Sequence, residues 1–367
     1  MSLAFEGASL KLARVFSAMA LEEVGALVGK TRQYVHKLET GQSAPTETLI
    51  LSLAEALNVE PEFFQSRVNR LHEDQFHFRK LLSTTKTTKQ VAIARGEVVH
   101  SLIGYLEKQL RLPSVNIPSI PYIHSHDCIE RAAESCREEW DLGLGPVDNM
   151  TRLAENLGAV VLSFEGLTKE IDALSVAVER PFIVRNNAKE STSRYRFDIA
   201  HELGHLVMHE GVVTGDRITE NQANRFASAF LLPRSMMMKF FPRPNGTRLD
   251  WKGIREFKGN WKVSKGAILY RARQLEIITD AQYKTGVITL KKHEGTREKD
   301  DYLIPEEPPE VLLKSLALLA SKKGLCEEKL ARALNVKPAF LRELLGPSTL
   351  APLQSVAKRA GYLRIIK

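Results

Sequence analysis

The chain has 367 residues, 43% of them hydrophobic, and a formal net charge of +8 at pH 7. At about 150 residues per domain this length predicts two or three domains, and no apolar run approaches the roughly 18 residues of a membrane-spanning helix. The three cysteines, Cys128, Cys136 and Cys326, are too few and too scattered for a disulfide framework and fit a reducing compartment. The amphipathic start lacks the apolar core of a signal peptide, so we expect a cytoplasmic protein without membrane contact.

The positive charge is spread unevenly along the chain. Residues 1–70 carry 7 Lys and Arg against 8 Asp and Glu, whereas residues 71–125, 126–300 and 301–367 have net charges of +3, +2 and +4. A basic balance permits nucleic-acid binding without establishing it. Any DNA contact made by the N-terminal part must therefore depend on the placement of a few side chains.

Apolar periodicity and breakers divide the chain into four regions. Residues 1–65 predict an all-α bundle, and residues 66–125 predict a helical segment followed by a Pro-rich linker. Residues 126–300 predict an α+β domain, because short strands rich in Val, Ile and Phe (GAVVLSF, LSVAVE, PFIVRN) lie among helices. Residues 301–367 predict a C-terminal helical region, and no long internal repeat stands out. The expected fold is multi-domain and mainly α, with one α+β domain that contains a small sheet.

The strongest chemical motif is His201-Glu202-Leu203-Gly204-His205, an HExxH. Residues four apart share one face of a helix, so the two imidazoles can bind one metal ion. A catalytic zinc keeps three protein ligands and one water, whose pKa falls to about 7. Glu202 is the candidate catalytic residue, because a carboxylate beside that water can accept its proton and return it to the leaving amine. The alternative is a surface helix with incidental histidines.

A third metal ligand is available fifteen residues beyond His205. Thr219 and Gln222 fit a capping box, which predicts a helix start there and puts Glu220 in its first turn. Glu220 would complete a His₂Glu set, which binds zinc or manganese, and Asn224 could orient a ligand from one turn further on. Glu220 could instead serve as a favourable charge at the helix N-terminus. Glu210 and Asp216 are rival ligands, and we interpret His209 as a helix-end histidine.

The segments SRYRFDIAHELGHLVMHE, ENQANRFASAFLLP and WKVSKGAILYRARQLEII resemble the ImmA/IrrE metallopeptidase family, and so does the upstream segment IERAAESCREEWDLGLGPVDNMTRLAENLGAVVL. The resemblance covers about residues 126–285. It implies a zincin-like α+β fold, His201, His205 and Glu220 as metal ligands, and Glu202 as the acid/base. The family more usually has an acidic residue where this chain has Gln222. Members typically cleave a repressor, often of the helix-turn-helix type, in response to stress or DNA damage.

Residues 11–64 resemble the lambda-repressor-like (XRE) helix-turn-helix family. LEEVGALV predicts the first helix of the motif, Val28-Gly29-Lys30 the turn, and residues 31–37 the recognition helix, which enters the major groove of double-stranded DNA. Arg32 suits guanine and Gln33 suits adenine. Phosphate or base contacts are expected from the other polar side chains of the run, Lys30, Thr31, Tyr34, His36 and Lys37. Such modules usually act as dimers on two half-sites, so we expect a homodimer. The alternative is a bundle that has lost DNA binding and serves dimerisation.

Residues 234–273 hold 11 Lys and Arg against two carboxylates, with six aromatic residues interleaved. This composition suits single-stranded nucleic acid; the alternative, which we favour, is a solvated helical face whose aromatic side chains pack in the core. Further on, GLCEEKLARALNVKPAFLRELLG has the rhythm of a second small helix-turn-helix, and it could equally be a helical cap or a dimer contact.

These features together predict a DNA-binding transcriptional regulator with a zinc endopeptidase. Its substrate would be a regulatory protein, either a repressor-like partner or the chain itself, in a stress, phage or mobile-element response. Two alternatives stay open: a metal- or ligand-sensing repressor that cuts nothing, and an antitoxin or immunity regulator that acts by partner binding.

Overall fold

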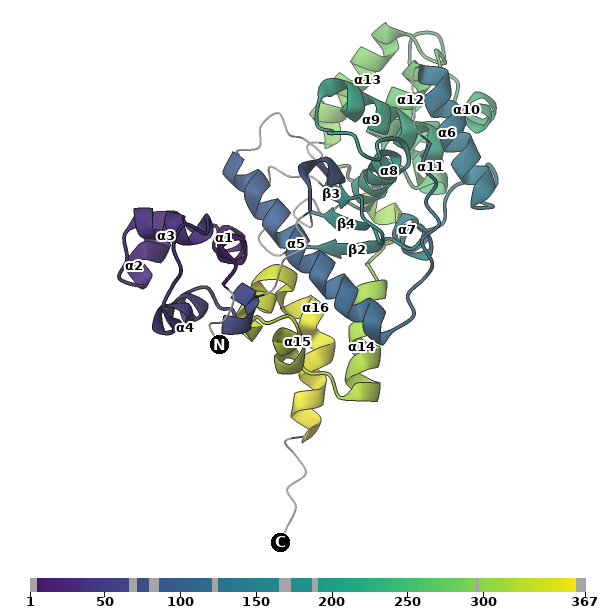
Figure 1. Cartoon of the computed structure of the whole chain (residues 1–367). Coiled ribbons are helices and arrows are strands. Elements are labelled where there is room, and N and C mark those ends of the chain that lie inside the picture. The colour runs from purple at the N-terminus through teal and green to yellow at the C-terminus, as the bar shows by residue number, and fades with distance from the viewer. Residues whose placement is uncertain are drawn as a thin grey trace.

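The computed structural model describes residues 5–65, 71–78, 86–120, 125–164, 173–186, 191–294 and 297–360. The chain is mostly helical and contains one small sheet (Figure 1). The helices are α1 (Gly7–Phe16), α2 (Leu21–Leu27), α3 (Arg32–Glu39), α4 (Glu47–Ala56), α5 (Lys86–Gln109), α6 (His126–Glu139), α7 (Met150–Asn156), α8 (Thr192–Met208), α9 (Arg217–Leu231), α10 (Arg234–Phe240), α11 (Trp251–Trp261), α12 (Lys265–Gln274), α13 (Asp280–Glu294), α14 (Val311–Lys323), α15 (Glu327–Ala333) and α16 (Pro338–Ala360). Three-residue to five-residue 3₁₀ turns include η1 (Pro61–Gln65). None of the described helices is long and apolar enough to cross a bilayer.

The sheet has four strands in the order β1-β3-β4-β2. Strand β3 (Ala173–Val176) pairs antiparallel with both β1 (Phe76–Phe78) and β4 (Phe182–Arg185), and β4 pairs parallel with β2 (Val160–Ser163). Strand β1 comes from the region for which the sequence predicts only a helix and a linker. Three residues are too few for a periodicity to be recognised, and pairing with β3 supplies the backbone hydrogen bonds that make them a strand.

The two faces of the sheet border two different hydrophobic cores. Alternate strand residues such as Phe76, Leu174 and Val184 belong to a core that also contains α5 and the C-terminal helices. Val161 and Ile183, which point the other way, belong to a core built mainly from α6, α8, α9, α11 and α12. Because neighbouring residues of a strand face opposite sides, β2 and β4 contribute to both cores, whereas β1 and β3 place the polar side chains of His77 and Ser175 on the second side.

The Pro-rich stretch after α5 is not a free linker. Residues 111–120 have no regular secondary structure, but they run along the α+β domain. The Asn116 backbone N–H donates to the Leu157 carbonyl at 3.0 Å, and the Ile120 N–H donates to the Val207 carbonyl at 2.7 Å. The boundaries of the four predicted regions stay predictions, because residues from different regions pack into the same hydrophobic core.

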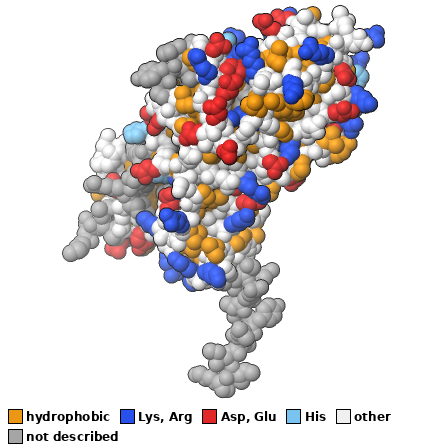
Figure 2. Space-filling model, turned by 90° about the vertical axis from the view of Figure 1, so that its right-hand side faces the viewer, with side chains coloured by type: hydrophobic (Ala, Val, Ile, Leu, Met, Phe, Trp, Pro, Cys, Tyr) orange, Lys and Arg blue, Asp and Glu red, His pale blue; other side chains and the backbone are white. Residues whose placement is uncertain are grey.

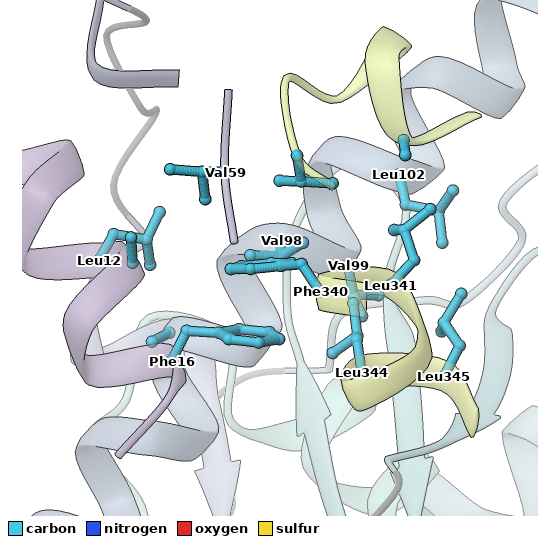
Figure 3. Packing of buried hydrophobic residues seen from close by; sticks show 14 of the residues in the cluster. Leu12, Phe16, Val59, Val98, Val99, Leu102, Phe340, Leu341, Leu344 and Leu345 are labelled. Carbon is cyan, nitrogen blue, oxygen red and sulfur yellow. The ribbon is translucent and has the colours of Figure 1, made fainter. Parts of the chain in front are cut away.

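The N-terminal helices form a small bundle at one end of the molecule, with α2 and α3 on its outer side (Figure 1). This bundle shares a core with α5 and the C-terminal helices α14, α15 and α16. Figure 3 shows Phe16 of α1 beside Phe340 of α16, next to Val98 of α5. The two phenyl rings stack with centroids 3.7 Å apart. The C-terminal region is therefore packed directly onto the N-terminal bundle.

Candidate metal centre

The HExxH motif lies on α8, whose N-terminus is capped by Ser191 through a hydrogen bond from the Arg194 N–H. His201, Glu202 and His205 are fully buried. Burial of three polar side chains on one helix face is costly unless each has a polar partner. Their burial therefore favours a built site over a surface helix with incidental histidines.

Glu220 is brought to the same place by α9, which packs along α8. The expected capping box is wrong in its details, because α9 begins at Arg217 and its N-cap is Asp216. The Asp216 carboxylate accepts from the N–H groups of Ile218 and Thr219 at 2.6 and 2.8 Å. Asp216 thus takes the place of Thr219 as the N-cap of α9, and Glu220 still lies in the first turn of this helix. Asp216 is committed to capping, which removes it as a rival ligand.

The three candidate ligand atoms face one another. The Nε2 atoms of His201 and His205 lie 3.0 Å apart. Glu220 carboxylate oxygens lie 3.5 Å from Nε2 of His201 and 3.2 Å from Nε2 of His205. Tetrahedral zinc with ligand distances of about 2.0–2.1 Å separates its ligand atoms by about 3.3 Å. The donor set and its spacing therefore fit a zinc ion, and Glu210 is not part of the cluster.

A second layer of polar side chains orients the two histidines. Nδ1 of His201 lies 3.0 Å from Oδ1 of Asn224. Nδ1 of His205 lies 2.9 Å from Nδ1 of His209, and Nε2 of His209 lies 2.8 Å from Oε1 of Gln222. If Nε2 of His205 is left for a metal, the proton of the neutral His205 ring is on Nδ1, which donates to Nδ1 of His209. The proton of His209 is then on Nε2, which donates to the Gln222 oxygen. Such outer partners fix the tautomer of a metal-ligating histidine.

This arrangement accounts for two residues left open by the sequence. His209 is the C-cap of α8, as expected of a helix-end histidine, and it also supports His205. Gln222, where the related family more usually has an acidic residue, accepts from His209 and does not reach the ligand cluster. Burial lowers the pKa of His205 to about 3 and also lowers the pKa of His209, so both rings stay neutral at neutral pH.

Glu202 is held by the sheet rather than by its own helix. One carboxylate oxygen, Oε2, accepts a hydrogen bond from the Ser175 hydroxyl at 2.6 Å. Ser175 lies on β3 between Leu174 and Val176, which face the other core. Strand alternation therefore turns Ser175 toward α8, where it fixes the carboxylate.

His77 is a site residue that the sequence did not predict. It lies on β1 opposite Ser175, faces the same side of the sheet, and is fully buried. Its ring stacks on that of His205 with centroids 5.1 Å apart, and its Nδ1 lies 3.0 Å from the Thr214 hydroxyl. Burial lowers the pKa of His77 to about 2. The sequence offered one clue to His77, which is its position between two phenylalanines. In a strand, such a histidine faces the opposite side of the sheet from its two neighbours.

Gly204 sets the distance between α8 and α9. A Cβ at this position would lie 2.9 Å from Cδ1 of the fully buried Phe226. We expect Gly204→Ala to destabilise the metal-free protein by about 1–3 kcal/mol, because the overpacking outweighs the better helix propensity of alanine. Gly259→Ala on α11 is the matched control, since nothing lies within 4 Å of its added Cβ. Urea unfolding followed by tryptophan fluorescence measures both; equal stability of the two variants would contradict the close packing.

Comparison with protein families agrees with this geometry. A family model described as the IrrE N-terminal-like domain, a peptidase family, matches residues 154–273, and a helix-turn-helix model matches residues 10–64. Residues 154–273 form an IrrE N-terminal-like domain. The chain thus joins this domain to an XRE-type helix-turn-helix, as the sequence motifs imply. Searches of curated proteins and of solved structures found no match. His77 lies outside the matched stretch, so the IrrE-like domain receives it from a neighbouring segment.

The structure places the predicted DNA-reading residues on and just before α3. Lys30, Arg32 and Gln33 are exposed, and so are His36 and Lys37 further along the helix. Thr31 is the N-cap of α3 and accepts from the Tyr34 N–H at 3.2 Å. Tyr34 is half-buried. The turn before α3 contains Gly29 with φ of +64°, a conformation that glycine adopts at little cost.

Residues 234–273 combine buried and exposed basic side chains, and Arg243 and Arg248 are among the exposed ones. Lys258 is fully buried and lies within 3.0 Å of carboxylates from Glu298, Asp300 and Asp301. Arg271 makes a bidentate pair with Glu130 at 2.7 Å, and the rings of Phe257 and Trp261 are buried. On the face drawn in Figure 2, basic, acidic and hydrophobic side chains are intermixed over the upper part of the molecule. Packing therefore accounts for the buried side chains of this stretch, and binding of single-stranded nucleic acid by its exposed side chains stays a prediction.

Proposed function

We propose that the chain is a DNA-binding regulator whose IrrE-like domain is a zinc-dependent endopeptidase. The observation that carries the proposal is the close spacing of the His201, His205 and Glu220 side chains: the two Nε2 atoms lie 3.0 Å apart, and one Glu220 oxygen lies 3.2 Å from His205 while the other lies 3.5 Å from His201. A zinc ion held by them would lower the pKa of a bound water to about 7 and polarise a peptide carbonyl.

Glu202 is the residue that moves the proton in this proposal. It lies on the same helix face as the two histidines, is fully buried, and is fixed by the Ser175 hydroxyl at 2.6 Å. A carboxylate held in one orientation beside the attacking water can accept its proton and deliver it to the leaving amine. His77, stacked on His205 and hydrogen-bonded to Thr214, positions the ligand ring from the sheet side.

A separate regulatory protein is a better substrate than the chain itself. Self-cleavage within residues 66–125 would separate the DNA-binding head only if nothing else held it. The head is also held by the stack of Phe16 on Phe340 and by the pairing of Val59 with Val336. A single cut in that region would leave these contacts in place, so we favour a repressor-like partner as the substrate.

The peptidase proposal is tested with zinc-loaded full-length protein and a proteome-derived peptide mixture. We expect new N-termini, identified by mass spectrometry, that appear with time and disappear when the metal is chelated. No cleavage by a protein that holds one zinc per chain would favour the second candidate, a metal-sensing regulator that cuts nothing. The specific observation behind that candidate is the complete burial of His201, Glu202 and His205.

DNA binding by α3 makes a separate prediction. Selection from random double-stranded DNA by the full-length protein should give a preferred site. Arg32→Ala and Gln33→Ala should each weaken binding to that site about 10–100-fold and relax its sequence preference, because bidentate base contacts contribute about 1–3 kcal/mol each. Arg243→Ala, which also removes an exposed arginine, is the control and should bind normally. Unchanged affinity and preference in both α3 variants would exclude α3 as the reading helix.

A further inference from the structure

The chain contains a short internal repeat. Residues 53–64 read LAEALNVEPEFF and residues 330–341 read LARALNVKPAFL, with eight of twelve positions identical. The first copy runs from the end of α4 into η1, and the second runs from α15 into the start of α16.

The two copies have the same local conformation. Asn58 and Asn335 both adopt a left-handed backbone, with φ of +54° and +56°. The next residue in each copy closes the turn with an equivalent bond, from the Val59 N–H to the Ala54 carbonyl at 3.0 Å and from the Val336 N–H to the Ala331 carbonyl at 2.9 Å. A proline then begins the following helical turn in both copies.

The two copies also bind each other. Val59 and Val336 form an antiparallel bridge. The Glu60 N–H donates to the Asn335 carbonyl at 2.9 Å, and the Lys337 N–H donates to the Asn58 carbonyl at 2.9 Å. Exchanging the two copies converts one of these bonds into the other. The contact therefore has the form of an isologous interface, in which the same residues pair from both sides.

Apolar burial at this contact is extensive. Val59 and Val336 are 0% and 1% exposed, and the equivalent phenylalanines Phe63 and Phe340 are 8% and 1% exposed. An ion pair between Lys337 and Glu55 lies at its edge. Within one chain, this surface of the DNA-binding domain is thus covered by the C-terminal copy.

We propose that residues 57–64 form a self-pairing surface of the DNA-binding domain, that the C-terminal copy occupies it within one chain, and that displacing this copy lets two chains pair through it. The partner is a second copy of this chain, because the repeat presents to Val59 the same Leu-Asn-Val turn and the same backbone groups that a second chain would present, although Glu60 of a second chain would stand in the place of Lys337. The pairing does not depend on the proposed peptidase or DNA-binding activity.

The C-terminal copy supplies no second reading helix. The residues that align with 30–37 are 307–314, which contain Pro308 and Pro309 and begin a helix only at Val311. One intact chain therefore presents a single α3, whereas two chains paired through Val59 present two. As long as the C-terminal copy of the same chain covers residues 57–64, the regulator would present only one reading helix.

Disulfide trapping in the full-length chain tests the pairing. Val59 and Val336 are a non-hydrogen-bonded antiparallel pair, whose Cα atoms lie about 4.5 Å apart, within reach of a disulfide. Val59→Cys with Val336→Cys should give a link within one chain. Val59→Cys with Val336→Asp, which places a carboxylate in the buried contact, should give a 59-to-59 link between two chains. Peptide mass spectrometry identifies these links and separates them from links through Cys128 or Cys326.

Controls keep the outcome independent of misfolding and of other dimer contacts. Val59→Cys alone should give at most a tenth of the 59-to-59 link, because the C-terminal copy covers the surface. Val59→Cys with Lys337→Glu, a milder opening that repels Glu55, should raise the yield at least fivefold. The same charge change at exposed Lys329 should not. Absence of a 59-to-59 link in both opened variants, with helical content unchanged, would overturn the proposal, and so would equal linking in Val59→Cys alone.

Discussion

Replacing Glu220 by alanine should lower the zinc content of the purified protein from about one ion per chain to less than a tenth of that value. Among the residues that the structure describes, the substitution leaves only the two imidazoles of His201 and His205 in the ligand cluster, and a catalytic zinc site needs three ligands. Elemental analysis after dialysis, on wild type and variant prepared side by side, measures the loss. The α9 helix should be unaffected, because its N-cap is Asp216 and not Glu220.

Two further variants, at Asn224 and Glu210, show how zinc binding depends on residues near the ligands. Asn224→Ala removes the acceptor for Nδ1 of His201 and should weaken zinc binding about 10–100-fold while retaining some metal. Glu210→Ala, an exposed carboxylate outside the cluster, should bind zinc like the wild type. If Glu220→Ala kept a full zinc ion, the third ligand would have to be another side chain, and His77 would be the first to replace.

Glu202→Gln should abolish peptide cleavage while leaving zinc binding intact. The amide keeps the size of the carboxylate and its hydrogen bond with Ser175, but it cannot accept a proton from water. General-base catalysis contributes about 10²–10⁴-fold, so the rate of appearance of new N-termini should fall by at least that factor. Glu210→Gln, at an exposed position just after α8, is the matched control and should cleave normally.

The comparison between zinc content and cleavage decides how the site works. A Glu202→Gln protein with one zinc and no activity is the expected result. Full activity in that variant would remove Glu202 from the proton transfer. In that case, Ser175→Ala should also have no effect on rate, whereas our assignment expects it to lower the rate by loosening the carboxylate.

Local patterns were enough to predict the candidate metal ligands, which the structure brings together. The HExxH motif places two imidazoles on one face of a helix, whatever the rest of the fold. A carboxylate in the first turn of the next helix completes the candidate set of three metal ligands. The helix-turn-helix is local in the same sense, because its helices, its glycine turn and its cap lie within residues 20–40. In both cases the interacting groups are close in sequence, so spacing alone carries the information.

Contacts between distant segments could not be predicted in the same way. His77 reaches His205 only because β1 pairs with β3 at the edge of the sheet, and Lys258 is neutralised by carboxylates forty residues away or more. The net charge of residues 234–273 gives no information about those partners, so the burial of Lys258 within this basic stretch could not be predicted from composition. The predicted N-cap of α9 was wrong for a simpler reason. Asp216 and Thr219 are both residue types that suit an N-cap, and the helix begins directly after Asp216.

The sequence by itself determined the two domain types, and it also gave the candidate metal ligands and the candidate reading helix, since each depends on residues within one or two adjacent helices. Only the tertiary structure decided that His77 and Ser175 join the metal site and that the C-terminal helices cover the DNA-binding domain. The physical reason is that strand pairing and core packing join residues by shape and hydrogen bonding across more than a hundred positions. The repeat at Val59 and Val336 became visible in the same way, because the fold brings its two copies into contact.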